Sequence, residues 1–282
     1  MFQKRAAAIH DISCFGKCSL TVAIPVLSAA GIETCPIPTA MLSTHTGGFT
    51  DIHVRDLTDD VMPVAEHWKS LDLHFDAIYT GYLGSFKQLE IVSDIVDKFR
   101  GEGTTIVVDP VMADNGRLYG GITEDFPAGM RKLCSKADII TPNFTEATLM
   151  LGEEYRDGPY TKEYVEDIIR RLGTFGAKTV VLTGVYFDQL QLGAAALDVA
   201  TGEISYAMGE WVEGCYHGTG DTFTSVLLAA MLNGCALGDA LQIAVDFVAR
   251  CVRRTSKDHP YMVYGVNFEA ELPLLMKALK LI

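Results

Sequence analysis

The sequence has no surplus of basic residues: 23 lysines and arginines stand against 36 aspartates and glutamates, and the net charge is −13. A surface this acidic argues against binding to the phosphate backbone of a nucleic acid and against docking on anionic lipid. A local pocket can oppose the overall charge, so a small anionic ligand remains compatible with this composition. We therefore expect no nucleic-acid partner.

Long hydrophobic runs are also missing. Two long apolar stretches without a charged residue are Cys18–Ile32 and Thr222–Gly238, and each is shorter than the roughly 20 residues that a membrane-spanning helix needs. The N-terminal residues contain neither the apolar stretch nor the cleavage site of a secretory signal. We expect the two uncharged stretches to be buried helices, and we expect no membrane partner.

Cysteine pairs and the common catalytic signatures are absent as well. The seven cysteines are scattered and form no CxxC pair, which is typical of free thiols in a reduced, cytoplasmic protein. We expect these thiols to be buried, and we expect Cys14 and Cys18 to bind no metal. The histidines show no zinc-ligand spacing, and the chain has neither a GxxxxGK[ST] P-loop nor a GxSxG nucleophile elbow.

The sequence does contain a regular alternation of short β-rich segments and helical segments. Hydrophobic residues make up 49% of the chain and charged residues 21%, which provides enough apolar material for a large core. Strands are expected at Ala6–His10, Thr34–Met41, Ala77–Thr80, Thr105–Val108, Asp138–Thr141 and Thr179–Thr183, followed by a hairpin of Gln191–Ala200 and Glu203–Met208. Helices are expected from the N-cap Ser19 to Gly31 and at Thr58–Leu71, Ser85–Arg100, Thr145–Leu151, Lys162–Phe175, Gly218–Asn233, Leu237–Thr255 and Phe268–Lys280. With no linker and no repeat, this pattern predicts an α/β fold in a single domain of residues 1–282, with a mostly parallel sheet covered on both faces.

Polar residues follow several of the predicted strands. Ligands of such sheets bind beyond the carboxyl ends of the strands, so these positions are candidate site residues. Asp109, Asn143, Glu146 and Thr183 are expected to converge on one edge of the sheet. The simpler alternatives are that Asp109 ends a strand before Pro110 and that Asn143 caps the next helix.

The sharpest local motif is Gly218-Thr219-Gly220-Asp221, which directly precedes the apolar run Thr222–Leu232. The two glycines allow the backbone to approach a ligand closely, and amides at a helix N-terminus form an anion hole. A carboxylate beside a bound phosphate has a reason to be there if it accepts a proton from an attacking hydroxyl group. The alternative is that Asp221 only caps the helix.

This motif resembles the anion hole and catalytic base of the ribokinase-like small-molecule kinases. Further segments resemble, in order, those of the pyridoxal (vitamin B6) kinases: STHTG at 43–47, TGYLGS at 80–85, VDPVMAD at 108–114 and ITPNFTE at 140–146. The resemblance runs from about Ile9 to the last helices. It implies a three-layer α/β/α ribokinase-like fold with a central, mostly parallel sheet. It also implies a cytoplasmic, homodimeric, ATP-dependent kinase that acts on pyridoxal, pyridoxine or pyridoxamine.

The resemblance also implies roles for individual residues. Asp221 would deprotonate the 5′-hydroxymethyl group of the substrate, and Gly218, Thr219 and Gly220 would hold the transferring phosphoryl group. The residues expected at the substrate ring are Asp11, Ser13, His45, Thr46 and Tyr82. Those expected at ATP are Asp109, Asn143, Glu146, Thr183 and Thr219. Mg²⁺ and a monovalent cation, K⁺, are expected at Asp114, Thr141 and Glu146, and residues 114–121 with Tyr119 would form a flap that excludes water from the phosphates.

One position departs from the vitamin B6 kinase pattern. Asp11 stands where that family usually has a serine, and an aspartate there resembles the hydroxymethylpyrimidine kinases of the same superfamily. Those enzymes, in turn, often carry cysteine where Asp221 stands. A hydroxymethylpyrimidine kinase of thiamine synthesis is therefore an open alternative, as is a non-catalytic nucleotide- or B6-binding regulator, although a regulator would not need Asp221. A sugar kinase fits less well, because the segment after Thr34–Met41 is short for the β-lid of those enzymes.

Overall fold

The computed structural model describes residues 3–258 and 264–282. Its centre is a nine-stranded sheet in the order β11-β10-β9-β8-β5-β4-β1-β2-β3. The strands from β2 to β9 in this order are parallel, while β3, β10 and β11 pair antiparallel at the two ends. The strand bounds are β1 (Arg5–Ser13), β2 (Glu33–Leu42), β3 (Val54–Asp56), β4 (Ala77–Thr80), β5 (Thr105–Val108), β8 (Ile139–Ile140), β9 (Thr179–Val185), β10 (Gln191–Asp198) and β11 (Ile204–Glu210).

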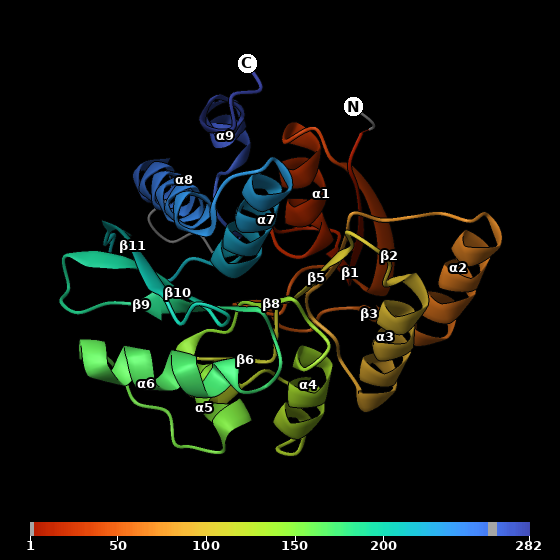
Figure 1. The fold of residues 1–282 in the computed structure, drawn as a ribbon, viewed down its shortest axis with the longest axis horizontal. Helices are drawn as coiled ribbons and strands as arrows, with labels where there is room; N and C mark the ends of the chain where they lie inside the picture. The colour runs from red at the N-terminus through yellow and green to blue at the C-terminus, as the bar shows by residue number, and fades with distance from the viewer. Residues whose placement is uncertain (1–2, 259–263) are drawn as a thin grey trace.

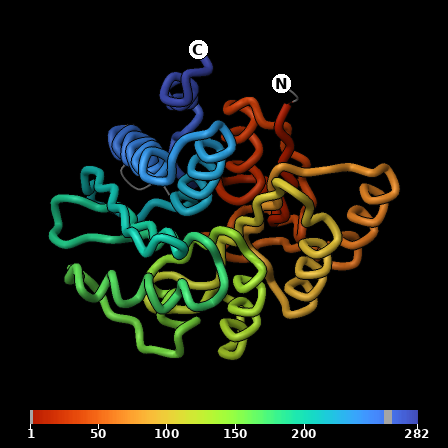
Figure 2. The backbone as a smooth tube through the Cα atoms, in the orientation of Figure 1, coloured from red at the N-terminus to blue at the C-terminus, as the bar shows by residue number. Residues whose placement is uncertain are grey.

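Helices cover both faces of the sheet, which confirms the predicted three-layer α/β/α architecture (Figure 1). One layer contains α1 (Leu20–Ala29), α7 (Thr219–Leu232), α8 (Leu237–Asp258) and α9 (Leu272–Ala278). The other contains α2 (Thr58–Ser70), α3 (Phe86–Phe99), α4 (Phe126–Cys134), α5 (Phe144–Leu151) and α6 (Lys162–Gly173). The backbone trace shows α1 beside α7, so the segment after the first strand lies against the helix of the glycine motif (Figure 2).

The two cores follow from the alternation of side chains along the strands. In β1, Ala7 and Ile9 pack into the core under α2–α6, whereas Ala6 packs into the core under α1, α7 and α8. A strand buried on both faces must be apolar at nearly every position, as β4 and β5 are. This explains why short continuous apolar runs, and not alternating patterns, marked the parallel strands in the sequence.

Most predicted elements are present, with several corrections. Strand β1 continues past His10 to Ser13, across a register shift between His10 and Ile12, so Asp11 belongs to the strand. The predicted helix at 268–280 is divided into a 3₁₀ turn, Glu269–Glu271, and α9. The prediction missed β3, α4 and a small hairpin of β6 (Ala113–Asp114) and β7 (Arg117–Leu118). Helix α4 contains Pro127, a residue type that argues against a helix interior but is well tolerated in the first turn, where it lies here.

Two further expectations need correction. Ser19 is the N-cap residue of α1, as predicted, but its φ is 50° and its ψ is −131°, and its side chain makes no cap hydrogen bond. The cysteines are free, as expected, but Cys14 and Cys215 are exposed and only Cys134 and Cys251 are fully buried.

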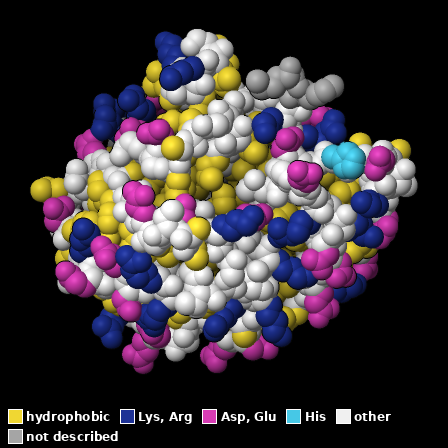
Figure 3. Space-filling view, viewed as in Figure 1, with side chains coloured by type: hydrophobic (Ala, Val, Ile, Leu, Met, Phe, Trp, Pro, Cys, Tyr) yellow, Lys and Arg dark blue, Asp and Glu magenta, His cyan; other side chains and the backbone are white. Residues whose placement is uncertain are grey.

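On one face of the molecule, acidic and basic side chains are interspersed, with no broad basic area (Figure 3). Among the residues that the structure describes, no helix combines the length and the apolar character needed to cross a membrane.

Candidate active site

The glycine motif forms the N-terminus of α7. Gly218 is the N-cap residue and has a left-handed backbone, with φ 74°. A Cβ atom at this position would lie 2.0 Å from the carbonyl oxygen of Lys17, so only glycine fits. Gly220 has no atom within 4 Å of the place where its Cβ would be, so the first turn is open on that side. The free amides at this end can therefore receive an anion such as a phosphoryl group.

Asp221 is the third residue of α7, and it does not cap the helix, because the N-cap is Gly218 and no side-chain cap bond is present. The side chain is half-buried, so it remains accessible from the site. Loss of hydration raises its pKa to about 7, the Ser19 backbone N–H acts against this rise, and the charge of Asp11 adds to it. A carboxyl group with a pKa near neutrality is suited to accept a proton from an alcohol.

Asp109, at the end of β5, lies under the same turn of α7. The hydroxyl group of Thr224 donates to Oδ2 of Asp109 at 3.1 Å and lies 3.1 Å from the hydroxyl oxygen of Thr141. Asp109 is only 4% exposed. Burial, followed by the charge of Asp221, raises its pKa to about 8.

Asn143 and Glu146 form a capping box at the start of α5. The Glu146 N–H donates to Oδ1 of Asn143, and the Asn143 N–H donates to Oε2 of Glu146, each at 2.9 Å. Oε1 of Glu146 accepts from the Met112 N–H at 3.1 Å, and Thr183 forms an isolated parallel bridge with Asn143. The four predicted strand-end residues therefore do meet at one edge of the sheet, although two of them also stabilise a helix terminus.

The predicted flap is the β6–β7 hairpin. The Gly116 N–H donates to the Thr145 hydroxyl group at 3.0 Å, which fastens the hairpin tip to α5. Asp114 is exposed and accepts hydrogen bonds from Asn115, and within the described part of the chain it forms no hydrogen bond with Thr141. Burial raises the pKa of Tyr119, and the charges of Glu146 and Asp114 raise it further, so the neutral phenol of Tyr119 lies close to the acidic groups.

The acidic groups at this edge fit a divalent cation that arrives with a ligand. Burial and the charge of Asp109 raise the pKa of Glu146 well above its usual range, so two carboxyl groups compete for protons in a poorly hydrated space. Oxygen ligands of this kind suit Mg²⁺, which commonly keeps water and takes phosphate oxygens as further ligands. Within the described part of the chain, no three His, Cys, Asp or Glu side chains are close enough to hold a metal ion by themselves.

The end of β1 brings a further acidic group to the site. Asp11 is 4% exposed, and Ser19 donates its hydroxyl hydrogen to Oδ1 of Asp11 at 2.5 Å. The Ser13 hydroxyl group lies 3.4 Å from Oδ2 and accepts from the Cys18 thiol. Burial raises the pKa of Asp11, while the hydroxyl groups of Ser19 and Ser13 lower it. Burial raises the pKa of Tyr82, and the charge of Asp11 raises it further, so these two predicted ring-binding residues lie near each other.

Aromatic side chains border this end of the site. His45 is buried, with its ring centroid 5.1 Å from Phe49 and 5.1 Å from His217. Its Nδ1 accepts from the Gly47 N–H at 3.1 Å, and Thr46 beside it is exposed. Tyr264 stacks on Phe49 at 5.9 Å. A flat, partly apolar ring suits such surroundings.

Three residues of the site were not found from the sequence. Thr224 could have been predicted, because it lies three residues after Asp221 on α7 and therefore shares its side of the helix. His217 was considered only as a possible metal ligand, yet its ring packs between His45 and Gly47. Ser19 was predicted to be a helix cap, and only the fold directs its hydroxyl group to Asp11.

Comparisons with known proteins agree with this geometry. The model of a family described as phosphomethylpyrimidine kinase matches residues 23–263. The structure of a provisionally named phosphomethylpyrimidine kinase from Bacteroides thetaiotaomicron, in a form with pyridoxal, is 39% identical, with 97% of this chain and 96% of that chain covered and a TM-score of 0.91. The pyridoxal kinase from Lactobacillus plantarum is 32% identical, with 98% of both chains covered and a TM-score of 0.89.

A third relative bears the name of the alternative activity considered above. The hydroxymethylpyrimidine/phosphomethylpyrimidine kinase of Haemophilus influenzae is 29% identical over 253 residues, which are 88% of this chain and 91% of the relative. The comparisons confirm the resemblance that the motifs carry. The chain belongs to the phosphomethylpyrimidine kinase family, within the ribokinase-like kinases that include the pyridoxal kinases.

Proposed function

We propose that this protein transfers the γ-phosphoryl group of ATP to the 5′-hydroxymethyl group of pyridoxal, pyridoxine or pyridoxamine. The observation that carries the proposal is Asp221: a half-buried carboxyl group with a pKa of about 7, in the first turn of a helix whose N-terminus is open to an anion. A protein that only binds a nucleotide would gain nothing from this group, since its charge repels a resting phosphate. The pyridine ring is favoured because the 39% identical Bacteroides thetaiotaomicron protein has been solved with pyridoxal.

In this mechanism Asp221 accepts the hydroxyl proton as the oxygen attacks the phosphorus. The amides of Gly218, Thr219 and Gly220 stabilise the negative charge of the transferring group, because they are already directed toward it before the reaction. Mg²⁺ bound with ATP would neutralise phosphate charge, with Glu146 and Asp109 nearest to it. Thr183 and Asn143 extend this polar edge, and Thr141 and Asp114 are proposed for a monovalent cation.

The same proposal assigns the ring to the other end of the site. Asp11, Ser13 and Tyr82 would contact polar substituents of the ring, and His45 and Thr46 would border it. The β6–β7 hairpin, with Tyr119, would limit hydrolysis of ATP by excluding water. We further propose that residues 1–282 act as a single domain, that the enzyme is a cytoplasmic homodimer, and that it supplies pyridoxal 5′-phosphate by salvage.

A coupled assay of ADP release, run side by side with pyridoxal, pyridoxine, pyridoxamine and hydroxymethylpyrimidine, tests the proposal. We expect the highest kcat/KM with one of the three vitamin B6 forms. The second candidate, a hydroxymethylpyrimidine kinase, is favoured by Asp11 and by the matching family model, and a higher kcat/KM with the pyrimidine would establish it. Absence of ADP release with all four compounds would leave a non-catalytic binding protein.

A further inference from the structure

Three segments that lie far apart in the sequence meet at the backbone of Lys17. A Cβ atom would lie 2.0 Å from the Lys17 carbonyl oxygen at Gly218 and 2.6 Å from it at Gly265, and both glycines have a positive φ, 74° and 105°. The Lys17 N–H donates to the carbonyl oxygen of Tyr264 at 2.7 Å. The loop after β1, the N-cap of α7 and the segment before α9 therefore pack against one another at this residue, with no space for a side chain at either glycine.

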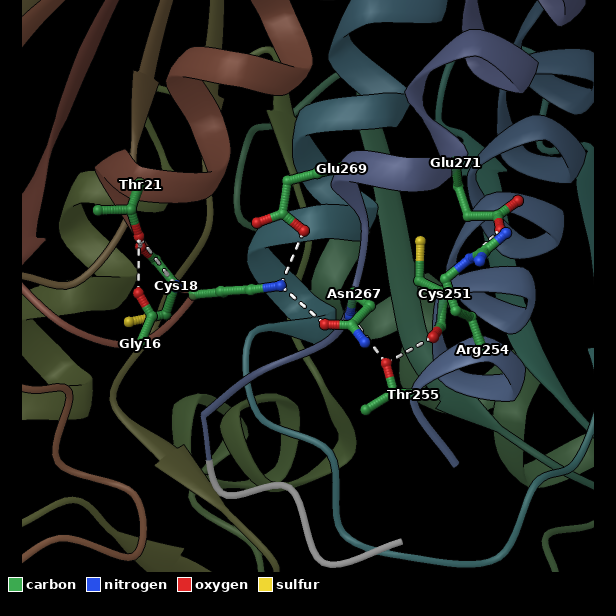
Figure 4. A network of polar contacts seen from close by, with 10 residues as sticks. Gly16, Cys18, Thr21, Cys251, Arg254, Thr255, Asn267, Glu269 and Glu271 are labelled. Carbon is green, nitrogen blue, oxygen red and sulfur yellow. Dashed lines mark hydrogen bonds and ion pairs between the residues drawn. The ribbon is translucent and has the colours of Figure 1, made fainter. Parts of the chain in front are cut away.

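The side chain of Lys17 extends the same connection. Its ammonium group donates to Oδ1 of Asn267 and to Oε2 of Glu269, both at 2.8 Å. It also lies 5.8 Å from the ring centroid of Phe268. Asn267, in turn, donates its backbone N–H to the hydroxyl group of Thr255 on α8 at 2.8 Å (Figure 4). Lys17 thus links the loop after β1 to a C-terminal segment that is itself fastened to α8.

An ion pair of the same kind elsewhere in the fold shows what is particular to Lys17. Nζ of Lys98 and Oε1 of Glu66 lie 2.7 Å apart, and the two side chains are 26% and 55% exposed. The corresponding exposed fractions are 27% for Lys17 and 54% for Glu269. Ion pairs exposed to this degree contribute little to stability. Lys98 only joins α3 to α2, whereas the backbone of Lys17 rests on the N-cap of the helix that carries the glycine motif.

The N-cap of α7 has to be placed accurately for phosphoryl transfer. Amides that stabilise a developing charge are effective only when they are directed toward it before the reaction. A displacement of about 1 Å from the reacting geometry can cost about 100-fold in rate. Because Gly218 begins the anion hole, a shift of the Lys17 carbonyl oxygen would move the amides of residues 218–220 with it.

We propose that Lys17 is a positioning residue for the anion hole. Its ammonium group, bound to Asn267 and Glu269, fixes the backbone against which Gly218 packs, and so sets the direction of the first amides of α7. This role rests on the proposed phosphoryl transfer. The packing itself exists without substrate, so it can be tested separately from activity.

The direct test is amide hydrogen exchange, measured by NMR on the substrate-free protein. The Thr222 amide is the probe, because it donates to the Gly218 carbonyl oxygen at 3.0 Å in the first turn of α7. Lys17→Met keeps an unbranched side chain and removes the ammonium group. We expect it to speed exchange of the Thr222 amide about tenfold, the effect of losing a hydrogen bond to a charged group. Lys98→Met, the matched control, should leave this rate unchanged. An unchanged rate in Lys17→Met, or equal rates in the two variants, would overturn the proposal.

Steady-state kinetics add a measurement that a loss of stability would not reproduce. We expect Lys17→Met to lower kcat by about 10–100-fold, as misaligned charge-stabilising amides do, while the KM values for ATP and the ring substrate change little. Lys17→Arg, which supplies a cation to the same two acceptors, should recover most of the turnover. Asn267→Leu keeps the cation and removes one acceptor, so it should also lower kcat. Wild-type kcat in Asn267→Leu would show that the loss in Lys17→Met comes from the charge itself and would contradict a positioning role.

The two measurements distinguish this proposal from the proposed function. If the wild type releases no ADP with any substrate, the proposed function fails, and exchange at Thr222 still decides whether Lys17 fixes the N-cap. If Lys17→Met does not fold, Glu269→Gln takes its place, because it removes only the charge of a half-exposed side chain. We expect faster exchange of the Thr222 amide in this variant as well, and an unchanged rate there would overturn the proposal.

Discussion

Buried carboxyl groups lie at both edges of the same sheet, and their surroundings differ. At the amino edge, where the parallel strands begin, Asp138 forms ion pairs with Nζ of Lys178 at 2.8 Å and with the guanidinium group of Arg100 at 3.5 Å. Its carboxylate also accepts a hydrogen bond from the Ile106 N–H at 2.8 Å. At the carboxyl edge, Asp109 and Glu146 form no ion pair with a lysine or arginine among the described residues, and their neighbours are hydroxyl groups, backbone amides and each other.

This difference distinguishes a carboxyl group that stabilises the fold from carboxyl groups that serve a function. A buried charge is costly unless it is paired, so Asp138 is explained by its cations and by the strand that it anchors. The acids of the carboxyl edge form no ion pair with a lysine or arginine among the described residues. Their raised pKa values reflect the free-energy cost of ionising a buried carboxyl group. A fold retains such a cluster where a cation or a reacting proton is to be bound.

The largest effect should come from Asp221, because it is the group proposed to move a proton. Asp221→Asn should lose about 10²–10⁴-fold in kcat, which is the usual contribution of a positioned general base. Nucleotide binding and the melting temperature should change little. Asp239→Asn is a matched control, since Asp239 lies in the first turn of α8 and is exposed. Near-wild-type turnover of Asp221→Asn would remove this residue from the mechanism.

The pH dependence of turnover should reveal the same group. Its pKa is raised to about 7, and the base works only when ionised, so kcat should fall as the pH decreases through 7. Well below that point the loss approaches about tenfold per pH unit. The measurement is kcat at saturating substrates from pH 5.5 to 9 (chosen to bracket the pKa, at roughly half-unit steps). A flat profile across this range would contradict the assignment.

The next largest effect is expected at Asp109 and Glu146, the two acids that form no ion pair with a lysine or arginine among the described residues. Asp109→Asn and Glu146→Gln should each weaken the apparent affinity for Mg²⁺ by about 10–100-fold, as is usual when a group that supports a metal is altered. Binding of the substrate ring should be preserved. Asp138→Asn is the control from the opposite edge: it should reduce stability but leave the Mg²⁺ dependence unchanged. An unchanged Mg²⁺ titration in both carboxyl-edge variants would mean that these residues act only as helix and strand caps.

Stability of the ligand-free protein gives an independent check on Asp109. Its folded pKa is raised from 3.8 to about 8, so the stability linked to its protonated form is complete below pH 3.8 and is lost as the pH rises through 8. Asp109→Asn should flatten this decline in the free energy of unfolding between those values. An equally steep decline in the variant would assign it to other groups.

The smallest effect on catalysis is expected at Asp11, which is proposed to contact the substrate ring. A hydrogen bond to a charged group contributes roughly 1.5–3 kcal/mol, enough for about a tenfold to hundredfold preference. Asp11→Ser should therefore change the relative kcat/KM among the three vitamin B6 forms and hydroxymethylpyrimidine more than it lowers kcat with the best of them. Equal losses on all four substrates would show that Asp11 supports the loop through Ser19 and does not contact the ring.

Local sequence patterns were enough to predict the order of most strands and helices, the three-layer class and the position of the glycine motif. These features depend on local patterns: continuous apolar runs for β4 and β5, helical spacing for α3, and two glycines before an apolar helix for α7. They also placed Asp109, Asn143 and Thr183 after adjacent parallel strands, and so at one edge of the sheet.

The contacts of each of these residues, in contrast, depend on how the distant elements pack together. The bond from Ser19 to Asp11 depends on a strained backbone held by segments some 250 residues away, such as Lys17 with Asn267. The bond from Thr224 to Asp109 crosses 115 residues of chain. A residue's own neighbours in sequence carry no information about such partners, because burial, orientation and pKa are set by whichever elements the completed fold packs around it.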